Sequence, residues 1–389
     1  MSPRTAPSPA SRARDGFIIH FGPEPAVTGV APGRVNLIGE HTDYNHGLCL
    51  PIALTHVTAA AAVPRDDDEL HIWSLILGRG TSISLDDLAP GHPQGWSGYV
   101  AGTIWALREA GHPVRGMDMV IGSDVPVGAG LSSSAALECA TAAAADAAFS
   151  LGLLSDDDGR RTLVQACRRA ENEIVGAPTG GLDQTAAMFA RAGHALLIDF
   201  HGDSLRHIPF DPESSGLELL AIDTHSHHSH ADGEYGRRRR ECEQAAAVLG
   251  VRSLREATAA DLEGMTDGEL RRRARHVVTE NGRVEEAVAA LEAADFAALG
   301  RLFDASHASL RDDYEVSCRE LDTACEAALA AGALGARMTG GGFGGSVIAL
   351  VRASEVRSVR KSVRGAFTAA GFAEPEFFVA NPGQGAWAE

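Results

Sequence analysis

Two glycine-rich segments constrain the fold of this chain more than any other feature. Residues 124–138 read DVPVGAGLSSSAALE, and their glycines permit a tight or left-handed turn that leads directly into an alanine-rich helix. Residues 338–346 read MTGGGFGGS, with five glycines in six residues, and lead into an apolar strand over residues 347–351. Backbone without side-chain bulk can approach a ligand closely, and a glycine turn at a helix N-terminus presents free N–H groups that suit phosphate.

Neither segment matches a common nucleotide-binding fingerprint. Residues 124–138 lack the Gly-Lys-Ser/Thr of a Walker A loop and the third glycine of a Rossmann turn. In residues 338–346 a G-x-G-x-x-G match exists, but a strand follows it where a Rossmann turn needs a helix. A serine-capped helix is the alternative for the first segment, and its three serines and two glycines exceed what capping requires. A flexible linker is the alternative for the second, and the apolar flanks disfavour it.

A polar cluster follows a short apolar run near the N-terminus, where residues 31–45 read APGRVNLIGEHTDYN. This density of donors and acceptors suits a polyhydroxylated ligand, because each sugar hydroxyl needs both kinds of partner. Polar clusters after strands are also often solvated loops, and this segment alone leaves both interpretations open.

A single carboxylate, Asp183, follows two glycines in GGLDQ, residues 180–184. Its position at a predicted helix start makes it a candidate base or metal ligand. A helix N-cap is the competing interpretation, and the local sequence by itself favours that one.

Composition limits the classes of function. The chain has 389 residues, 34 basic against 52 acidic side chains and a net charge of −18, which argues against a general nucleic-acid binder. No run approaches the roughly 20 apolar residues that span a bilayer, so we expect no membrane segment. Residues 1–16 lack the apolar core of a secretory signal and are expected to form a frayed tail. The six scattered cysteines indicate reduced thiols in a cytoplasmic protein.

The mixture of hairpin and helix patterns predicts an α+β architecture with two domains, residues 1–200 and 201–389. In the first half we expect strands flanking a turn over residues 49–63, a hairpin over 71–85 and a strand over 117–121. Helices are expected there over residues 98–110, 133–150, 155–175 and 183–189. In the second half we expect strands over residues 195–200, 217–224 and 347–351. Helices are expected there over residues 234–249, 252–310 with short breaks, 320–331 and 355–370.

Three of these segments, in this order and spacing, resemble the motifs of the GHMP small-molecule kinases. They are the polar motif (residues 31–45), the first glycine loop (residues 124–138) and the third motif (residues 338–346). Within that family, residues 33–45 (GRVNLIGEHTDYN) resemble the galactokinase signature, and the likeness extends from about residue 17 to the C-terminus. The resemblance implies a two-lobed fold with the active site in the cleft between the domains. It also implies ATP-dependent phosphorylation of D-galactose at the anomeric C1 hydroxyl, the first committed step of galactose catabolism, by a monomer.

The resemblance further implies roles for single residues. Asp183 would act as the base, and Arg34 would stabilise the charge of the transferred phosphoryl group. The sugar would contact Glu40, His41, Thr42, Asp43, Gly180 and Tyr235. The nucleotide would contact Ser74, Gly128, Ala129, Gly130, Leu131, Ser132, Ser133 and Ser134. A Mg²⁺ ion would bind Ser134 and Glu171, since Mg²⁺ prefers oxygen ligands and keeps several waters.

Two dense local clusters invite other interpretations. Residues 224–230 read THSHHSH, and imidazoles at this spacing can bind transition metals. We expect an exposed loop with adventitious metal affinity there, in which His230 matches a family histidine. Residues 237–240, four consecutive arginines, are expected to form a helix face that pairs with nearby glutamates. A phosphate patch, in which one arginine steers anionic ATP, is the alternative.

Two alternatives to a galactose kinase stand beside it. A non-catalytic galactose sensor on the same fold would be expected to damage the phosphate loop or lose the base, and both are present here. A kinase for arabinose or N-acetylgalactosamine is the other, because discrimination at C2 and C6 depends on residues that the motifs do not identify.

Overall fold

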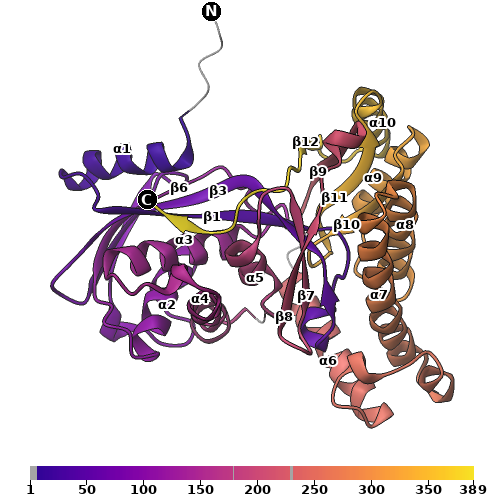
Figure 1. Cartoon of the computed structure of the whole chain (residues 1–389), viewed down its shortest axis with the longest axis horizontal. Helices are drawn as coiled ribbons and strands as arrows, with labels where there is room; N and C mark the ends of the chain where they lie inside the picture. The colour runs from indigo at the N-terminus through magenta and orange to yellow at the C-terminus, as the bar shows by residue number, and fades with distance from the viewer. Residues whose placement is uncertain (1–6, 178, 228–230) are drawn as a thin grey trace, which may run out of the picture.

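The structure, a computed structural model, describes residues 7–177, 179–227 and 231–389. Within these residues it contains a six-stranded, a four-stranded and a three-stranded sheet, with helices packed around them. Figure 1 shows two lobes, one built around the six-stranded sheet and the other around the four-stranded sheet with its long helices. This arrangement confirms the predicted α+β class.

The N-terminal lobe is built on the six-stranded sheet. Its strands are β1 (Val27–Asn36), β3 (Pro51–Pro64), β4 (Glu69–Ser74), β5 (Arg79–Ser84), β6 (Met117–Ser123) and β13 (Trp387–Ala388). They lie in the order β13-β1-β3-β6-β4-β5, and only β4 and β6 run parallel. The β4–β5 pair confirms the predicted hairpin. Residues 51–64 form one continuous strand rather than two strands around a turn, because they pair along their length with β1 and β6.

Helices cover both faces of this sheet, with α1 (Pro9–Phe21) on one side (Figure 1). The other side carries α2 (Trp96–Glu109), α3 (Ser133–Ala148), α4 (Asp157–Arg169) and α5 (Leu182–Phe189). The expectation of a frayed tail over residues 1–16 is wrong from residue 9 onward. The Ser8 hydroxyl caps α1, and Ala13 and Phe17 are fully buried against the sheet.

Small residues let α3 approach β1 closely. A Cβ atom on Gly29 would lie 2.2 Å from the carbonyl oxygen of Ala140, and alanines occupy most of the buried helix face. The alanines that follow the first glycine loop therefore allow this close packing as well as favouring a helix. The position of α3 in turn sets where its N-terminus opens.

A short three-stranded sheet lies between the lobes, with strands β2 (Leu48–Cys49), β7 (His194–Asp199) and β8 (Ser204–Pro209). The chain crosses from the first lobe to the second through this sheet.

The C-terminal lobe contains the four-stranded sheet, in the order β10-β11-β9-β12. Its strands are β9 (Leu217–His227), β10 (Gly335–Thr339), β11 (Gly344–Arg352) and β12 (Glu376–Val379). Its helices are α6 (Ala231–Leu249), α7 (Gly268–Glu292), α8 (Phe296–Asp312), α9 (Arg319–Ala330) and α10 (Val356–Ala370). Alternate residues of β9 face opposite hydrophobic cores: Leu219 and Ala221 pack in one, and Leu220 and Ile222 in the other.

Short helical turns complete the described chain. They are η1 (Asp43–Asn45), η2 (Leu85–Asp87), η3 (Leu153–Ser155), η4 (Ala170–Val175), η5 (Glu213–Ser215), η6 (Leu254–Glu256) and η7 (Asp261–Gly264), of which η4 is a π-helix and the others are 3₁₀ turns.

The two lobes share buried structure. Val35 and Leu37 of the polar motif (residues 31–45) pack in one core with Val284 of α7 and Ile348 of β11. The last strand, β13, returns to the first lobe and pairs with β1, so the chain ends in the lobe where it began (Figure 1). The boundary between residues 200 and 201 stays a prediction. All six cysteines are free, as predicted. None of the described helices combines the length and apolar character that crossing a bilayer requires.

Candidate active site

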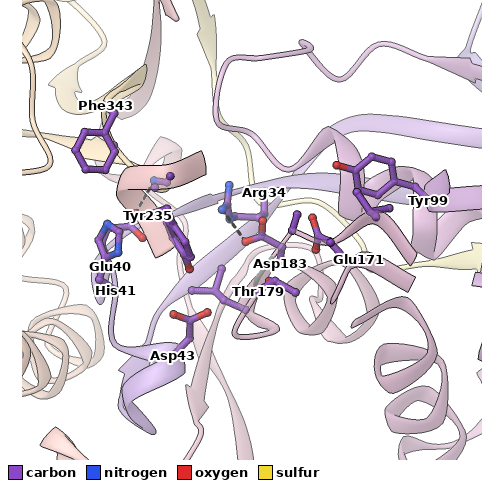
Figure 2. A pocket seen from close by; sticks show the side chains of 18 residues that line it. Arg34, Glu40, His41, Asp43, Tyr99, Glu171, Thr179, Asp183, Tyr235 and Phe343 are labelled. Carbon is purple, nitrogen blue, oxygen red and sulfur yellow. Dashed lines mark hydrogen bonds and ion pairs between the residues drawn. The ribbon is translucent and has the colours of Figure 1, made fainter. Parts of the chain in front are cut away.

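A cavity of about 630 Å³ opens between the lobes, and its lining includes residues of the polar motif and of the third motif together with Asp183. The N-terminal lobe supplies one wall from β1, η1, η4 and α5, and the C-terminal lobe supplies the other from α6 and the loop after β10 (Figure 2). Predicted site residues in its lining are Arg34, Glu40, His41, Asp43, Glu171, Asp183 and Tyr235. The lining also includes residues 340–343 of the third motif.

Asp183 and Arg34 form an ion pair in the cavity wall. Asp183 lies in the first turn of α5, and its Oδ1 is 2.6 Å from Nη2 of Arg34 on β1. Figure 2 shows the two side chains pointing toward each other, with Glu171 beside them. A second Arg34 nitrogen, Nη1, donates to the Gly130 carbonyl oxygen at 2.7 Å. Arg34 therefore joins the carboxylate to the first glycine loop.

The other oxygen of Asp183 accepts a hydrogen bond from the Ser132 hydroxyl. The Asp183 side chain is 26% exposed, so one side of the carboxylate still faces the cavity. Its neighbours thus fix the carboxylate without covering it.

Glu40 connects the polar motif to the third motif. Its Oε1 accepts from the Gly340 backbone N–H at 2.8 Å, and its Oε2 accepts from Asn36 Nδ2 at 2.9 Å. The Arg337 guanidinium lies 3.5 Å from Oε1. Burial raises the pKa of Glu40, and the charge of Arg337 opposes that shift.

His41 sits in an aromatic wall of the cavity. Its φ is 62°, and its Nδ1 lies 2.8 Å from the Tyr44 hydroxyl. The Tyr44 hydroxyl lies 2.7 Å from that of Tyr314, and the Tyr235 ring packs against His41 at 5.4 Å between centroids. Burial lowers the pKa of His41 to about 3, so the ring is neutral at neutral pH and can both donate and accept. Burial likewise raises the pKa of Tyr235 well above its usual value, which keeps its hydroxyl protonated.

Asp43 and Gly180 are packed against each other. A Cβ atom on Gly180 would lie 2.0 Å from Oδ2 of Asp43, so only glycine fits beside this carboxylate. Burial raises the pKa of Asp43 to about 6. Thr42, also predicted to contact the sugar, is not among the residues that line the cavity. Its side chain is fully buried, and its hydroxyl lies 2.7 Å from the Leu48 carbonyl oxygen, where it holds the turn.

The predicted metal pair is brought together. Glu171 lies in the π-helical turn η4, which places its carboxylate beside Asp183 and within hydrogen-bond reach of the Ser134 hydroxyl at the start of α3. Burial, with repulsion from Asp183, raises the pKa of Glu171 to about 7. One hydroxyl and one carboxylate fit a Mg²⁺ ion whose other ligands are phosphate oxygens and water. The described residues contain no group of three or more His, Cys, Asp or Glu side chains that could hold a metal.

A second cavity, of about 340 Å³, adjoins the start of α3. Its lining is mostly apolar and includes three predicted nucleotide residues, Ser74, Ser133 and Ser134. An apolar slot that ends at a helix N-terminus suits a nucleoside with attached phosphates. Ser132 is not among its lining residues.

The first glycine loop has the predicted left-handed geometry. Gly128 and Gly130 have φ angles of 82° and 71°, and both are exposed. The residues between and after them point inward. The Ala129 carbonyl oxygen accepts from the Ser346 hydroxyl at 2.7 Å, and the Leu131 side chain is buried in the core between the lobes. The loop can therefore present backbone N–H groups outward while it is anchored beneath.

Three residues near the site were not singled out from the sequence. Tyr99 of α2 lines both cavities, and nothing in its helical context distinguishes it. Gln184 is fully buried and donates to Glu171 at 2.6 Å and to Glu138 at 2.9 Å. Arg337 is fully buried, and a lone arginine in an apolar strand before a glycine loop is a signal that could have found it.

The two clusters outside the motifs differ in outcome. Arg237, Arg238 and Arg239 pair with glutamates on α6 and α7, as predicted. His225 lies in strand β9 rather than in a loop, and its Nδ1 is 2.8 Å from the Glu374 carbonyl oxygen. His228 and His230 lie outside the described residues.

Comparison with protein families finds three matches along the chain. The galactokinase galactose-binding signature matches residues 15–64. The N-terminal domain of GHMP kinases matches residues 98–191, and the C-terminal domain of that family matches residues 287–369. The signature thus covers the polar motif, and the N-terminal domain covers the first glycine loop and Asp183.

Whole-chain comparisons agree with these matches. The chain is 50% identical over 372 residues to a galactokinase of Streptomyces coelicolor, covering 94% of this chain and 95% of that one. It is 51% identical over 348 residues to a galactokinase of Mycobacterium tuberculosis, covering 89% and 94%. The crystal structure of Lactococcus lactis galactokinase complexed with galactose matches with a TM-score of 0.89 at 35% identity, covering 96% and 98%. The Methanococcus jannaschii mevalonate kinase matches with a TM-score of 0.65 at 18% identity, which shows a shared fold.

Proposed function

The chain belongs to the galactokinases, within the GHMP kinase family, and on that premise we propose that it transfers the γ-phosphoryl group of ATP to the C1 hydroxyl of D-galactose. The products are galactose 1-phosphate and ADP. A bond forms between the C1 oxygen and the γ-phosphorus, the bond to the β,γ-bridging oxygen breaks, and the hydroxyl proton passes to a base.

Asp183 is the base in this proposal. It lies in the wall of the larger cavity, and the Arg34 guanidinium at 2.6 Å holds in place the carboxylate that accepts the proton. Arg34 also stabilises negative charge on the phosphoryl group as it is transferred, because its guanidinium lies between the carboxylate and the first glycine loop.

The sugar binds in the larger cavity. Asp43 and Glu40 accept hydrogen bonds from its hydroxyls, and neutral His41 and the Tyr235 hydroxyl can donate or accept. Gly180 leaves room for Asp43, and Thr42 acts through the turn that carries His41 and Asp43.

ATP binds with its base in the smaller cavity, beside Ser74, and its phosphates along residues 128–134. When bound, Mg²⁺ would be held by Ser134 and Glu171 and would neutralise charge on the phosphates. Tyr99 borders both cavities, which supports a path for the phosphate chain from one to the other.

The observation that carries the proposal is the Arg34–Asp183 pair, through which the polar motif that contains Arg34 is joined to Asp183 and to the first glycine loop. Purified protein with MgATP should phosphorylate galactose far faster than glucose, arabinose or N-acetylgalactosamine, and Asp183→Ala should abolish turnover while still binding ATP. Comparable rates on glucose would refute the specificity. Galactose binding without turnover by the unaltered protein would favour the sensor alternative.

A monomeric state and a cytoplasmic location complete the proposal. Both derive from the sequence and the family resemblance. Light scattering coupled to size-exclusion chromatography tests the first, and a single species near twice the chain mass of 40.7 kDa would contradict it.

A further inference from the structure

Ser132 performs neither of the two roles that its position suggests. It is the N-cap residue of α3, yet its φ and ψ are 58° and 45°, and its side chain makes no capping hydrogen bond. N-cap serines usually have an extended backbone and accept a hydrogen bond from an N–H group in the first turn. Ser132 also does not line the nucleotide cavity, whereas Ser133 and Ser134 do. Its hydroxyl is therefore used neither for capping nor in that cavity.

The hydroxyl donates instead to Oδ2 of Asp183, across 51 residues of sequence. Oδ1 of the same carboxylate is held by Arg34 at 2.6 Å. Each carboxylate oxygen has two lone pairs, so one protein partner on each leaves acceptor capacity for a substrate hydroxyl. Ser132 is only 8% exposed, so this contact is largely shielded from solvent.

The left-handed backbone of Ser132 directs the side chain toward α5. Residues other than glycine and asparagine adopt this conformation at a cost, because the Cβ atom crowds the neighbouring backbone. This conformation occurs together with the hydrogen bond to Asp183.

We infer that Ser132 is a positioning residue for the phosphoryl transfer: together with Arg34 it fixes the plane of the Asp183 carboxylate against the C1 hydroxyl. This inference rests on the proposed function. It separates Ser132 from Ser133 and Ser134, whose side chains face the nucleotide, although all three are adjacent in sequence.

The test uses substitutions that differ in backbone strain and in donor capacity. Ser132→Gly removes the hydroxyl and accommodates the φ of 58° without strain, whereas Ser132→Ala removes the hydroxyl and keeps the strain. Ser132→Asn tolerates the conformation and retains an N–H donor. Thr141→Ala is the matched control, because Thr141 lies further along α3 and its hydroxyl donates to the Leu137 carbonyl oxygen at 2.8 Å.

Ser132→Gly should lower kcat by about 10- to 100-fold, the effect of one hydrogen bond to a charged group. The Kd values of galactose and of a non-hydrolysable ATP analogue should stay within about twofold of the unaltered protein. Ser132→Asn should recover part of kcat, and Thr141→Ala should leave it unchanged.

Four outcomes overturn the inference. An unchanged kcat with weaker binding of the ATP analogue would assign the hydroxyl to a phosphate. A lower kcat accompanied by weaker binding of both ligands and by lower thermal stability would show that the role of Ser132 is merely structural. Absence of galactose turnover by the unaltered protein would refute the proposed function and the inference with it, whereas normal turnover with an unaffected Ser132→Gly refutes the inference alone.

Discussion

Gly180→Ala should weaken galactose binding without disturbing the rest of the site. The added Cβ atom would lie 2.0 Å from Oδ2 and 2.4 Å from Cγ of Asp43. A carbon–oxygen contact relaxes near 3.4 Å, so the carboxylate must move by more than about 1 Å. Gly180 is not among the glycines with positive φ, so alanine adds no backbone strain there. The perturbation therefore acts through the position of one carboxylate.

The size of the effect follows from what Asp43 is proposed to do. A hydrogen bond to a charged group contributes about 1.5–3 kcal/mol, so a displaced Asp43 should raise the galactose Kd and KM by about 10- to 100-fold. The kcat at saturating galactose should fall less, because the three atoms nearest the added methyl group belong to Asp43 and Tyr44 and not to Asp183 or Arg34. The KM of MgATP should stay within about twofold.

A double-mutant cycle distinguishes collision from general damage. Asp43→Ala removes the carboxylate that Gly180→Ala would displace, so the second substitution should add less than about threefold to the first. The remaining contact, 3.0 Å from the Tyr44 backbone nitrogen, needs only a small shift. Gly282→Ala is the control, because a Cβ atom there meets nothing within 4 Å. A Gly180→Ala protein with a normal galactose KM, or additive effects in the cycle, would refute the reasoning.

Two further predictions concern charge in the site. Arg34→Ala should lower kcat by about 10³-fold or more while changing galactose affinity little, because the guanidinium acts on charge that develops during transfer. Rapid-quench kinetics measures the rate of the transfer step. A change in KM with an unaltered kcat would contradict this prediction. Burial raises the pKa of Glu171 to about 7, so its stabilising contribution is complete below the unfolded pKa near 4.5 and is lost as pH rises through 7. Urea unfolding without ligands should show stability falling over this range, less steeply in Glu171→Gln. If stability falls as steeply with pH in Glu171→Gln as in the unaltered protein, Glu171 is not the group responsible.

Local chemistry was readable wherever one short segment decided the outcome. The glycines of residues 128–130 predicted left-handed backbone, and the alanine-rich run after them predicted the helix that became α3. The helix at residues 9–21 was missed because its Ser8 cap is unremarkable in a Pro- and Arg-rich segment, and burial of Phe17 against the sheet stabilises it. Tyr99 and Gln184 were missed because their importance depends on which cavity or carboxylate lies opposite.

The sequence by itself determined the family, the α+β class, and which residues were available for phosphate, sugar and proton transfer. Only the tertiary structure decided which of them meet. Within residues 132–134, adjacent serines diverge: Ser132 bonds to Asp183, and the other two line the smaller cavity. Within residues 40–43, Glu40, His41 and Asp43 line the larger cavity, while the Thr42 side chain is buried in the turn. The physical reason is range. Backbone propensity acts over a few residues, whereas the partner of a side chain depends on how distant helices and strands pack around it.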